Sequence, residues 1–389
     1  MNKQLPDRIR IALRGWRNAG SEPRLDLFRW LLVACQVTTL LLGWPLWIVR
    51  DEPPPLPAFW YVFPSFDVGY ALLASLGVVL LAPRWGVLLH TLLLVFSLGM
   101  DQLRIQPQIV CCCILLWATL PSSSLQTIGR AYLVALWFYS GFHKLLSPSF
   151  YEGMWVVSRF LKDLAYATAT PPGELVTTLS VLAAVTEIVL AVMVLVPRTR
   201  QAASVLAFLL HGVILGLLVQ VDFNSAVWAW NVASAFAGFA LVWNWRQTPV
   251  GTFKALSAPA RVVVVVVLLS PLGYYGEFID AHLSHCLYSR NKPHGYVFPP
   301  EKGDPGAFYT SISEEVLKAT NSPLPPAHRL LEAYFLRSRK TSPGDFLYIR
   351  DRRLGADLRG RSDRWLQLNE TRELVPSKVQ YLVRTKRRE

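Results

Sequence analysis

The sequence predicts an all-α polytopic membrane helix bundle of about nine spans, followed by a small C-terminal extramembrane α+β domain. Only 17% of the 389 residues are charged and 52% are hydrophobic, whereas an ordinary soluble domain is about 25% charged. The mean hydropathy is +0.32. Most apolar residues also stand in long runs, close to the roughly 20 residues that a helix needs to cross a bilayer. These observations exclude a soluble globular, disordered or disulfide-stapled protein.

Nine apolar segments, separated by proline-containing or charged connections, are candidate spans. Several are short enough to merge or to re-enter the membrane, above all between residues 101 and 150, so the number stays at about nine. The segments are approximately 30–49, 66–82, 85–100, 108–120, 131–146, 175–196, 202–221, 225–245 and 262–279. We therefore expect a basic N-terminal segment at 1–29, a transmembrane bundle at 30–280 and a C-terminal domain at 281–389.

The distribution of basic residues predicts the orientation of this bundle. Up to residue 280, alternate connections carry 14 Lys and Arg on the side of the N-terminus and 5 on the other side. Because basic residues are enriched on the cytoplasmic side, the N-terminus is expected to be cytoplasmic. An odd number of spans then places the C-terminal domain outside. We expect an integral protein of the bacterial cytoplasmic membrane.

The formal net charge of +13 is expected to interact with the lipid bilayer, which is the first predicted partner. Basic residues flank membrane spans and attract anionic headgroups, so no nucleic acid is expected as a partner. Residues 7–16 combine helical apolar spacing with arginines, which fits either an interfacial helix or a plain basic flank. Cys111, Cys112 and Cys113 stand in one apolar run, which predicts reduced and buried thiols.

The C-terminal domain is expected to mix helices and strands. Ser311 followed by Glu314 resembles a capping box that opens a helix through Ala319. Residues 327–336 favour a second helix, and residues 346–349, 365–368 and 379–383 favour short strands. Such a domain could bind a protein partner.

A few ionisable side chains fall within the apolar segments, where they are costly and therefore candidates for function. Lys144, Glu187 and His211 are the candidate catalytic residues, because a desolvated lysine can act as a base and a buried Glu or His can hold a proton. The alternatives are a lysine that snorkels to the headgroups and interhelical hydrogen bonds that hold the bundle together. Three more residues are candidates for substrate binding: His143, Tyr139 and His90.

The stretch 139–145, Tyr-Ser-Gly-Phe-His-Lys-Leu, followed by Phe-Tyr-Glu-Gly at 150–153, resembles a motif of the vitamin K-dependent gamma-carboxylase membrane domain family. This horizontally transferred transmembrane family is distantly similar to DoxX-like proteins. Leu27-Phe28-Arg29, residues 197–200 and His211 support the resemblance, which covers roughly residues 25–290.

The resemblance implies that Lys144 stands at the position of a base that deprotonates a reduced quinone in oxygen-dependent chemistry. It therefore implies a quinone as cofactor or partner. It also implies a cytoplasmic N-terminus and an external C-terminal domain, as the distribution of basic residues does. This chain has His143-Lys144 where the animal enzyme has a lysine pair, and its C-terminal region of about 109 residues is much smaller. Peptide glutamate carboxylation is therefore not expected.

Two polar clusters lie in connections. Asp280, His282, His285 and Cys286 stand close together, but no established metal-binding spacing is present, so no metal site is expected and an interfacial anchor is favoured. Asp101 and Arg104 are expected to form an exposed ion pair of small energetic value. Phosphate-loop, dinucleotide and nucleophile-elbow motifs are absent from the sequence.

Two functions remain open from the sequence. The first is a membrane enzyme that acts on a quinone or another apolar substrate with Lys144 as base. The second is a non-catalytic membrane subunit or assembly factor whose C-terminal domain binds a partner. In the enzyme, Lys144, Glu187 and His211 should converge on a lipid-accessible cavity, whereas in the second case Lys144 should point to the headgroups.

Overall fold

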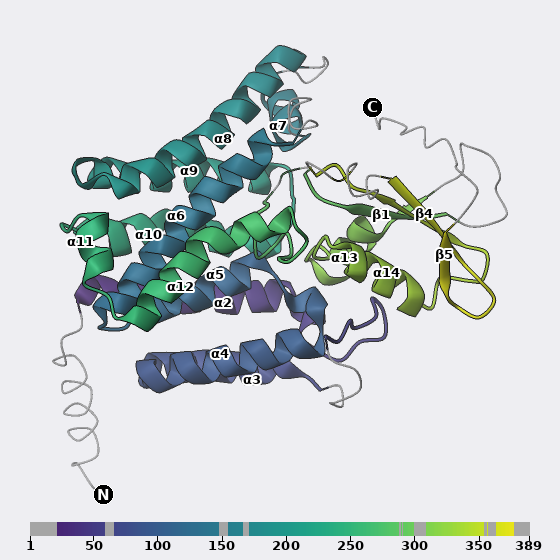
Figure 1. Ribbon diagram of the computed structural model, residues 1–389, viewed down its shortest axis with the longest axis horizontal. Helices are drawn as coiled ribbons and strands as arrows, with labels where there is room; N and C mark the ends of the chain where they lie inside the picture. Colours follow the sequence, from purple (N-terminus) through teal and green to yellow (C-terminus); the bar gives the residue numbers. More distant parts are fainter. Residues whose placement is uncertain are drawn as a thin grey trace, which may run out of the picture.

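The computed structural model describes residues 22–58, 66–147, 155–165, 171–287, 289, 291–298, 309–353, 356 and 363–376. A helical bundle and a smaller domain with a β-sheet lie end to end (Figure 1). The interfacial helix expected at 7–16 lies outside the described residues. The helices of the bundle are α2 (Pro23–Leu42), α3 (Val68–Leu81), α4 (Pro83–Met100), α5 (Pro107–Ala118), α6 (Ser123–Leu145), α7 (Trp155–Ala165), α8 (Gly173–Leu195), α9 (Arg200–Gln220), α10 (Trp228–Ala237), α11 (Pro249–Lys254) and α12 (Ala258–Leu269).

Five of the described helical segments are long and apolar enough to cross a membrane: Pro23–Leu42, Pro83–Met100, Gly173–Leu195, Pro197–Gln220 and Ser225–Val242. Three further apolar helices are shorter, at Val68–Leu81, Pro107–Ala118 and Ala258–Tyr274. The nine expected spans are therefore not confirmed. Helix α6 has 23 residues but is less apolar than α8, because it carries polar side chains that face other helices rather than lipid.

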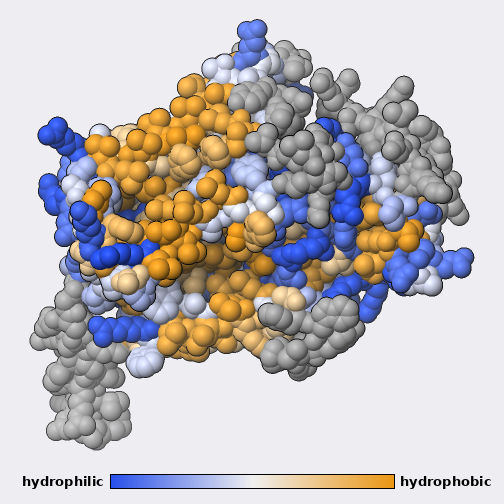
Figure 2. Space-filling view, viewed as in Figure 1, coloured by the Kyte–Doolittle hydropathy of each residue, from blue (hydrophilic) through white to orange (hydrophobic). Residues whose placement is uncertain are grey.

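The outer surface of the bundle is apolar, as an integral membrane protein requires. Large hydrophobic side chains are exposed on many of the helices. Examples from α4, α8, α9 and α12 are Leu92, Leu182, Leu209 and Val262, with exposed fractions of 54–62%. Figure 2 shows this apolar surface over the bundle, with hydrophilic residues gathered at its two ends. Such an extensive apolar surface is not tolerated in water and indicates contact with lipid.

Proline and hydroxyl residues set where several helices begin. Pro23, Pro83 and Pro107 occupy the first turn of α2, α4 and α5, where a missing backbone N–H costs nothing. The Ser122 hydroxyl accepts a hydrogen bond from the Leu125 N–H and caps α6. Local chemistry therefore places the start of α6, the helix that carries most of the candidate site.

The C-terminal domain holds an antiparallel sheet in the order β2-β1-β3-β4-β5. Its strands are β1 (His294–Phe298), β2 (Thr310–Ser311), β3 (Phe346–Arg350), β4 (Asp363–Leu368) and β5 (Leu374–Pro376). The expected helices are confirmed as α13 (Ile312–Thr320) and α14 (His328–Arg337), and the Ser311 hydroxyl caps α13 through the Glu314 N–H. Strands β3 and β4 are confirmed as well, whereas the strand expected at 379–383 lies outside the described residues.

The domain packs directly on one end of the bundle. Gln106 donates a hydrogen bond from its side chain to the Pro323 carbonyl, at 2.9 Å. Asn321 reaches the Leu42 carbonyl at the end of α2, at 3.1 Å. One cluster of buried hydrophobic side chains extends from the bundle into the domain. The domain is therefore fixed to the bundle along much of its surface.

Asp101 and Arg104 form the expected ion pair, at 3.8 Å, but its expected exposure is wrong. Both residues are buried, with exposed fractions of 1% and 4%. Asp101 forms an ion pair with Arg50 and accepts a hydrogen bond from the Leu56 N–H at 3.0 Å, and Arg104 donates to the Leu46 carbonyl at 2.9 Å. The loop after α2 folds over this turn, which sequence spacing alone does not reveal.

Candidate functional site

The candidate site lies where α6 and α8 pack closely against each other at Gly141. Gly141 makes this approach feasible, because a Cβ atom at this position would stand 2.3 Å from the Ala184 carbonyl oxygen and 3.2 Å from the Glu187 Cβ. Small residues allow the backbones of membrane helices to come together in this way. The approach aligns Ser140 and Lys144, one helical turn apart on α6, with Glu187 on α8.

Lys144 and Glu187 form a buried ion pair. The Lys144 Nζ atom lies 2.6 Å from both carboxylate oxygens of Glu187 and 3.0 Å from the Ser140 hydroxyl oxygen. The exposed fractions of the two side chains are 6% and 7%. An ammonium group has three protons to donate, and these three acceptors can take all of them. Lys144 therefore faces Glu187 and does not point to the headgroups.

His211 belongs to a neighbouring but separate contact. Its Nε2 atom accepts a hydrogen bond from the Trp137 indole N–H at 3.0 Å, and its Nδ1 atom lies 3.1 Å from the Asn231 side-chain oxygen. Because an indole nitrogen can only donate, we assign His211 as the tautomer that carries its proton on Nδ1. His211 thus joins α9 to α6 and α10, and no hydrogen bond joins it to Lys144 or Glu187 in the described part of the chain.

Tyr139 connects α6 to the end of α12, and His143 connects α6 to the segment that follows α12. The His143 Nε2 atom donates to the Ser284 carbonyl at 2.9 Å, and its Nδ1 atom lies 2.9 Å from the Tyr275 hydroxyl. The Tyr139 hydroxyl donates to the Leu268 carbonyl at 2.8 Å. Both side chains are therefore occupied by tertiary hydrogen bonds.

His90 lies in a different helix interface. It contacts Gln36 on α2 at 2.8 Å through Nε2 and the Ser75 hydroxyl on α3 at 2.7 Å through Nδ1. Of the six candidate residues, only Lys144 and Glu187 are joined by hydrogen bonds to each other, whereas the rings of Tyr139 and His143 stack one turn apart on α6. His143 is adjacent to Lys144 along α6, whereas His90 is not part of this site.

The polar residues after α12 have separate partners. Asp280 pairs with Arg329, the His282 Nδ1 atom lies 2.9 Å from the Ile105 carbonyl oxygen, and the His285 ring packs edge-on against Tyr132. Burial lowers the pKa of His282 to about 4 and that of His285 to about 3. Both histidines are thus neutral anchors of this connection at neutral pH.

One cluster was missed from the sequence. Ligand atoms of Glu277, His328 and Asp351 lie within 4.8 Å of one another, close enough to hold a metal ion. Arg353, however, forms ion pairs with Asp351 and with Glu277 at 2.7 Å. Burial acts to raise the pKa of Asp351, but hydrogen bonds from His328 and Arg353 outweigh it and hold that pKa far below its usual value. The guanidinium already supplies the positive charge here, and the cluster joins the domain to the end of the bundle.

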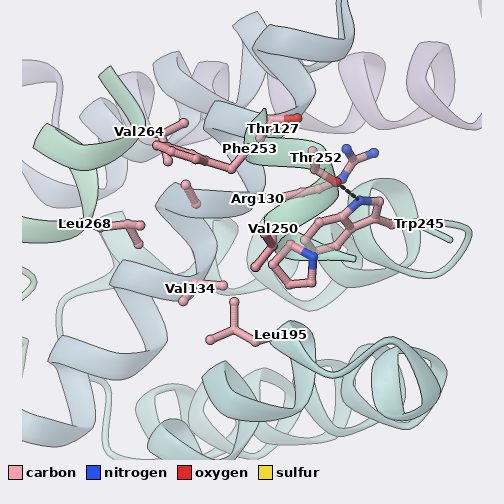
Figure 3. Close-up of a pocket in the computed structure, with 12 residues that line it drawn as sticks. Thr127, Arg130, Val134, Leu195, Trp245, Val250, Thr252, Phe253, Val264 and Leu268 are labelled. Atoms are coloured by element: carbon pink, nitrogen blue, oxygen red, sulfur yellow. Dashed lines mark hydrogen bonds between the residues drawn. The ribbon is translucent and has the colours of Figure 1, made fainter. Parts of the chain in front are cut away.

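The larger of two described cavities is at the opposite end of α6 from Lys144. It has a volume of about 290 Å³ and an almost wholly apolar lining, which is drawn in Figure 3. None of the six candidate residues lines either described cavity. The convergence of Lys144, Glu187 and His211 on a lipid-accessible cavity is therefore not seen in the described residues.

Comparison with known proteins points to a different family from the one that the motif suggested. Residues 122–226 match the family of methylamine utilisation protein MauE, a match that covers just over a quarter of the chain. No curated protein and no solved structure matches the chain. The resemblance to the vitamin K-dependent carboxylase membrane domain and to DoxX-like proteins is thus wrong, because the family match over the same region is to MauE. The matched segment runs from the start of α6 to the turn just before α10 and contains Lys144, Glu187 and His211.

Proposed function

We propose that this protein is a non-catalytic membrane subunit or assembly factor, whose bundle anchors the C-terminal domain and presents it to a protein partner outside the cytoplasm. Lys144 does not point to the headgroups, the position expected for such a subunit, but its closed environment inside the bundle carries the proposal. A lysine that acts as a base needs a neutral amine with room for a substrate. Here both carboxylate oxygens of Glu187 accept hydrogen bonds from Lys144 at 2.6 Å, and the Ser140 hydroxyl accepts a third at 3.0 Å.

The way in which the domain is attached supports the same proposal. Contacts through Gln106, Asn321 and Arg353 tie the domain to the bundle from several directions. A rigidly held domain offers a partner a preformed surface, which reduces the entropic cost of association. The distribution of basic residues in the connections supports an extracytoplasmic position for this domain.

The decisive experiment separates a structural role of Lys144 from a chemical one. Because the matching family is named for methylamine utilisation, the readout is growth of a deletion strain on methylamine as sole nitrogen source. Replacing a buried ion pair by apolar residues of similar size is often tolerated, whereas removal of one partner is not. Complementation by Lys144→Met is expected to fail through loss of protein, while Lys144→Met combined with Glu187→Leu restores both membrane level and growth.

Two outcomes would contradict this reading. If the double variant reaches the wild-type level in the membrane but does not restore growth, the chemistry of Lys144 is needed and the protein is an enzyme or a proton carrier. If the deletion strain grows normally on methylamine, the link to methylamine utilisation is wrong.

The partner is tested separately with a photocrosslinking amino acid in intact cells. Arg339 and Val375 are exposed positions in the domain, with a side-chain exposure of 73% for Arg339 and a residue exposure of 38% for Val375. The control is Val213 on α9, which is 62% exposed on the lipid-facing surface. A discrete protein adduct from domain positions, absent at Val213, is expected. A scan of exposed domain positions that yields no adduct would refute the partner.

A further inference from the structure

We propose that the cavity between α6, α11 and α12 binds one acyl chain of an anionic phospholipid from the leaflet that this end of the bundle faces. This site is distinct from the Lys144–Glu187 pair and does not depend on the proposed function. The observations that carry it are the apolar lining of the cavity, the position of its opening and the charges around that opening.

The lining suits a hydrocarbon chain. Val134 of α6, Phe253 of α11 and Leu268 of α12 line the cavity, and Leu195 closes it from the end of α8 (Figure 3). The polar groups beside them have partners within the protein. Arg130 donates to the Leu241 carbonyl at 2.7 Å, and the Trp245 indole N–H donates to the Thr252 hydroxyl at 3.1 Å. The cavity therefore offers almost no hydrogen bonds and favours an apolar occupant.

The cavity opens where lipid chains meet headgroups. Two lining residues are exposed at the surface, Val250 with 64% and Leu195 with 43%. Leu195 is the last residue of α8, and Val250 stands in α11, a helix of six residues at the end of the bundle. A chain can thus enter from the bilayer while its headgroup stays at the boundary.

The charges around the opening select the headgroup. Arg246 and Lys254 are exposed and directly follow the lining residues Trp245 and Phe253. Arg261 reaches the Lys254 carbonyl at 2.8 Å, which places a third basic residue beside α11. Basic residues close to a membrane surface attract anionic lipids by roughly 1 kcal/mol each. A zwitterionic lipid would gain much less from this arrangement.

The volume limits the occupant to a single chain. Sites for drug-sized ligands usually enclose roughly 300–1,000 Å³, and this cavity of about 290 Å³ lies at the lower limit. It is large enough for a flexible chain but not for a second chain or a headgroup. We therefore assign the cavity to one chain of a lipid whose other chain stays in the bilayer.

The test uses the purified full-length protein in detergent and native mass spectrometry. Phosphatidylglycerol and phosphatidylcholine with identical chains are titrated, and the fraction of protein that retains one lipid is measured. Wild type is expected to retain phosphatidylglycerol preferentially. Val250→Trp, which fills the opening from an exposed position, should abolish this retention, whereas Val262→Trp on the lipid-facing side of α12 should not.

A second pair of variants tests the headgroup. Arg246→Gln with Lys254→Gln should weaken binding of phosphatidylglycerol about thirtyfold and leave phosphatidylcholine unchanged. Arg84→Gln with Arg339→Gln removes the same charge elsewhere and should have no effect. Thermal unfolding verifies that all variants are folded. Equal retention of both lipids in the wild type, or full retention by folded Val250→Trp, would overturn the proposal.

Discussion

His282, which lies outside the membrane spans, acts as a neutral hydrogen-bonding group. It is 5% exposed and lies 2.9 Å from the Ile105 carbonyl oxygen. Its ring nitrogen must donate there, since a carbonyl can only accept. Such a contact holds the connection after α12 against the turn that follows α4, provided that the ring stays neutral.

This arrangement makes stability dependent on pH. The pKa of His282 is lowered to about 4 by burial, whereas an unfolded histidine titrates near 6.5. Below about pH 6.5 the His282 ring binds a proton in the unfolded state but stays neutral in the folded state. The free energy of unfolding therefore falls as the pH falls from 6.5 to 4. The contribution is about 3 kcal/mol at most.

His282→Asn should remove this contribution, because an amide can donate to the same carbonyl without titrating. Thermal unfolding of wild type and variant at pH 7.5 and pH 4.5 measures the effect. Between pH 7.5 and pH 4.5, the melting temperature of the wild type should fall by more than that of the variant. If the difference in melting temperature between wild type and variant is the same at both pH values, His282 is not a buried and neutral side chain.

At the scale of side chains, the sequence indicated which residues are unusual but not what they contact. Lys144 and Glu187 stand out as charges inside apolar runs, and they do meet. His90 on α4 stands out by the same criterion, yet its partners are Gln36 on α2 and Ser75 on α3. Spacing along a chain cannot decide which helices become neighbours. It therefore cannot tell a charged or polar residue of the site from one that packs in another helix interface.

Helix packing depends on small residues at a few close contacts. Gly141 is the sharpest example, since any side chain there would collide with the backbone of α8 at Ala184. Gly212 on α9 has no atom within 4 Å of the corresponding Cβ position. The two glycines thus have the same helical setting and opposite steric surroundings.

Gly141→Ala should therefore separate α6 from α8, weaken the Lys144–Glu187 pair and destabilise the protein by about 1–3 kcal/mol. Gly212→Ala is the matched control and should be neutral or slightly stabilising, because alanine favours a helix more than glycine does. Unfolding temperatures in detergent compare the two. Equal stability of both variants would show that the close contact at Gly141 is not tight.

Helices were easier to predict than strands for a physical reason. Long apolar runs and capping residues such as Ser311 act locally, so helices α13 and α14 follow from nearby residues. Strand β1 was missed because its pairing with β3 joins residues about fifty positions apart, at Tyr296 and Tyr348. The burial of Asp101 was missed for a similar reason, since its partner Arg50 comes from a different connection.

The whole molecule is held together by contacts between the bundle and the C-terminal domain. Arg353 is the centre of one such contact. Its guanidinium forms ion pairs with Asp351 and Glu277 and donates to the Tyr274 carbonyl at 3.1 Å, so one side chain links the domain to the last turn after α12. Such contacts cannot be read from the sequence, because nothing near Arg353 in the chain indicates Glu277.

Replacing Arg353 should loosen the domain without unfolding the bundle. Removal of one partner from a buried ion pair typically costs about 3–5 kcal/mol, because the remaining carboxylates are left uncompensated. Arg353→Gln should therefore increase amide hydrogen exchange in α14, β3 and residues 274–287 but leave α6 and α8 protected. Arg339→Gln is the control, since Arg339 forms an exposed pair with Asp51 at 3.3 Å that is worth about 1 kcal/mol or less. If α6 and α8 lose protection together with α14, the bundle and the domain unfold as one unit, and the bundle is then more than an anchor for the domain.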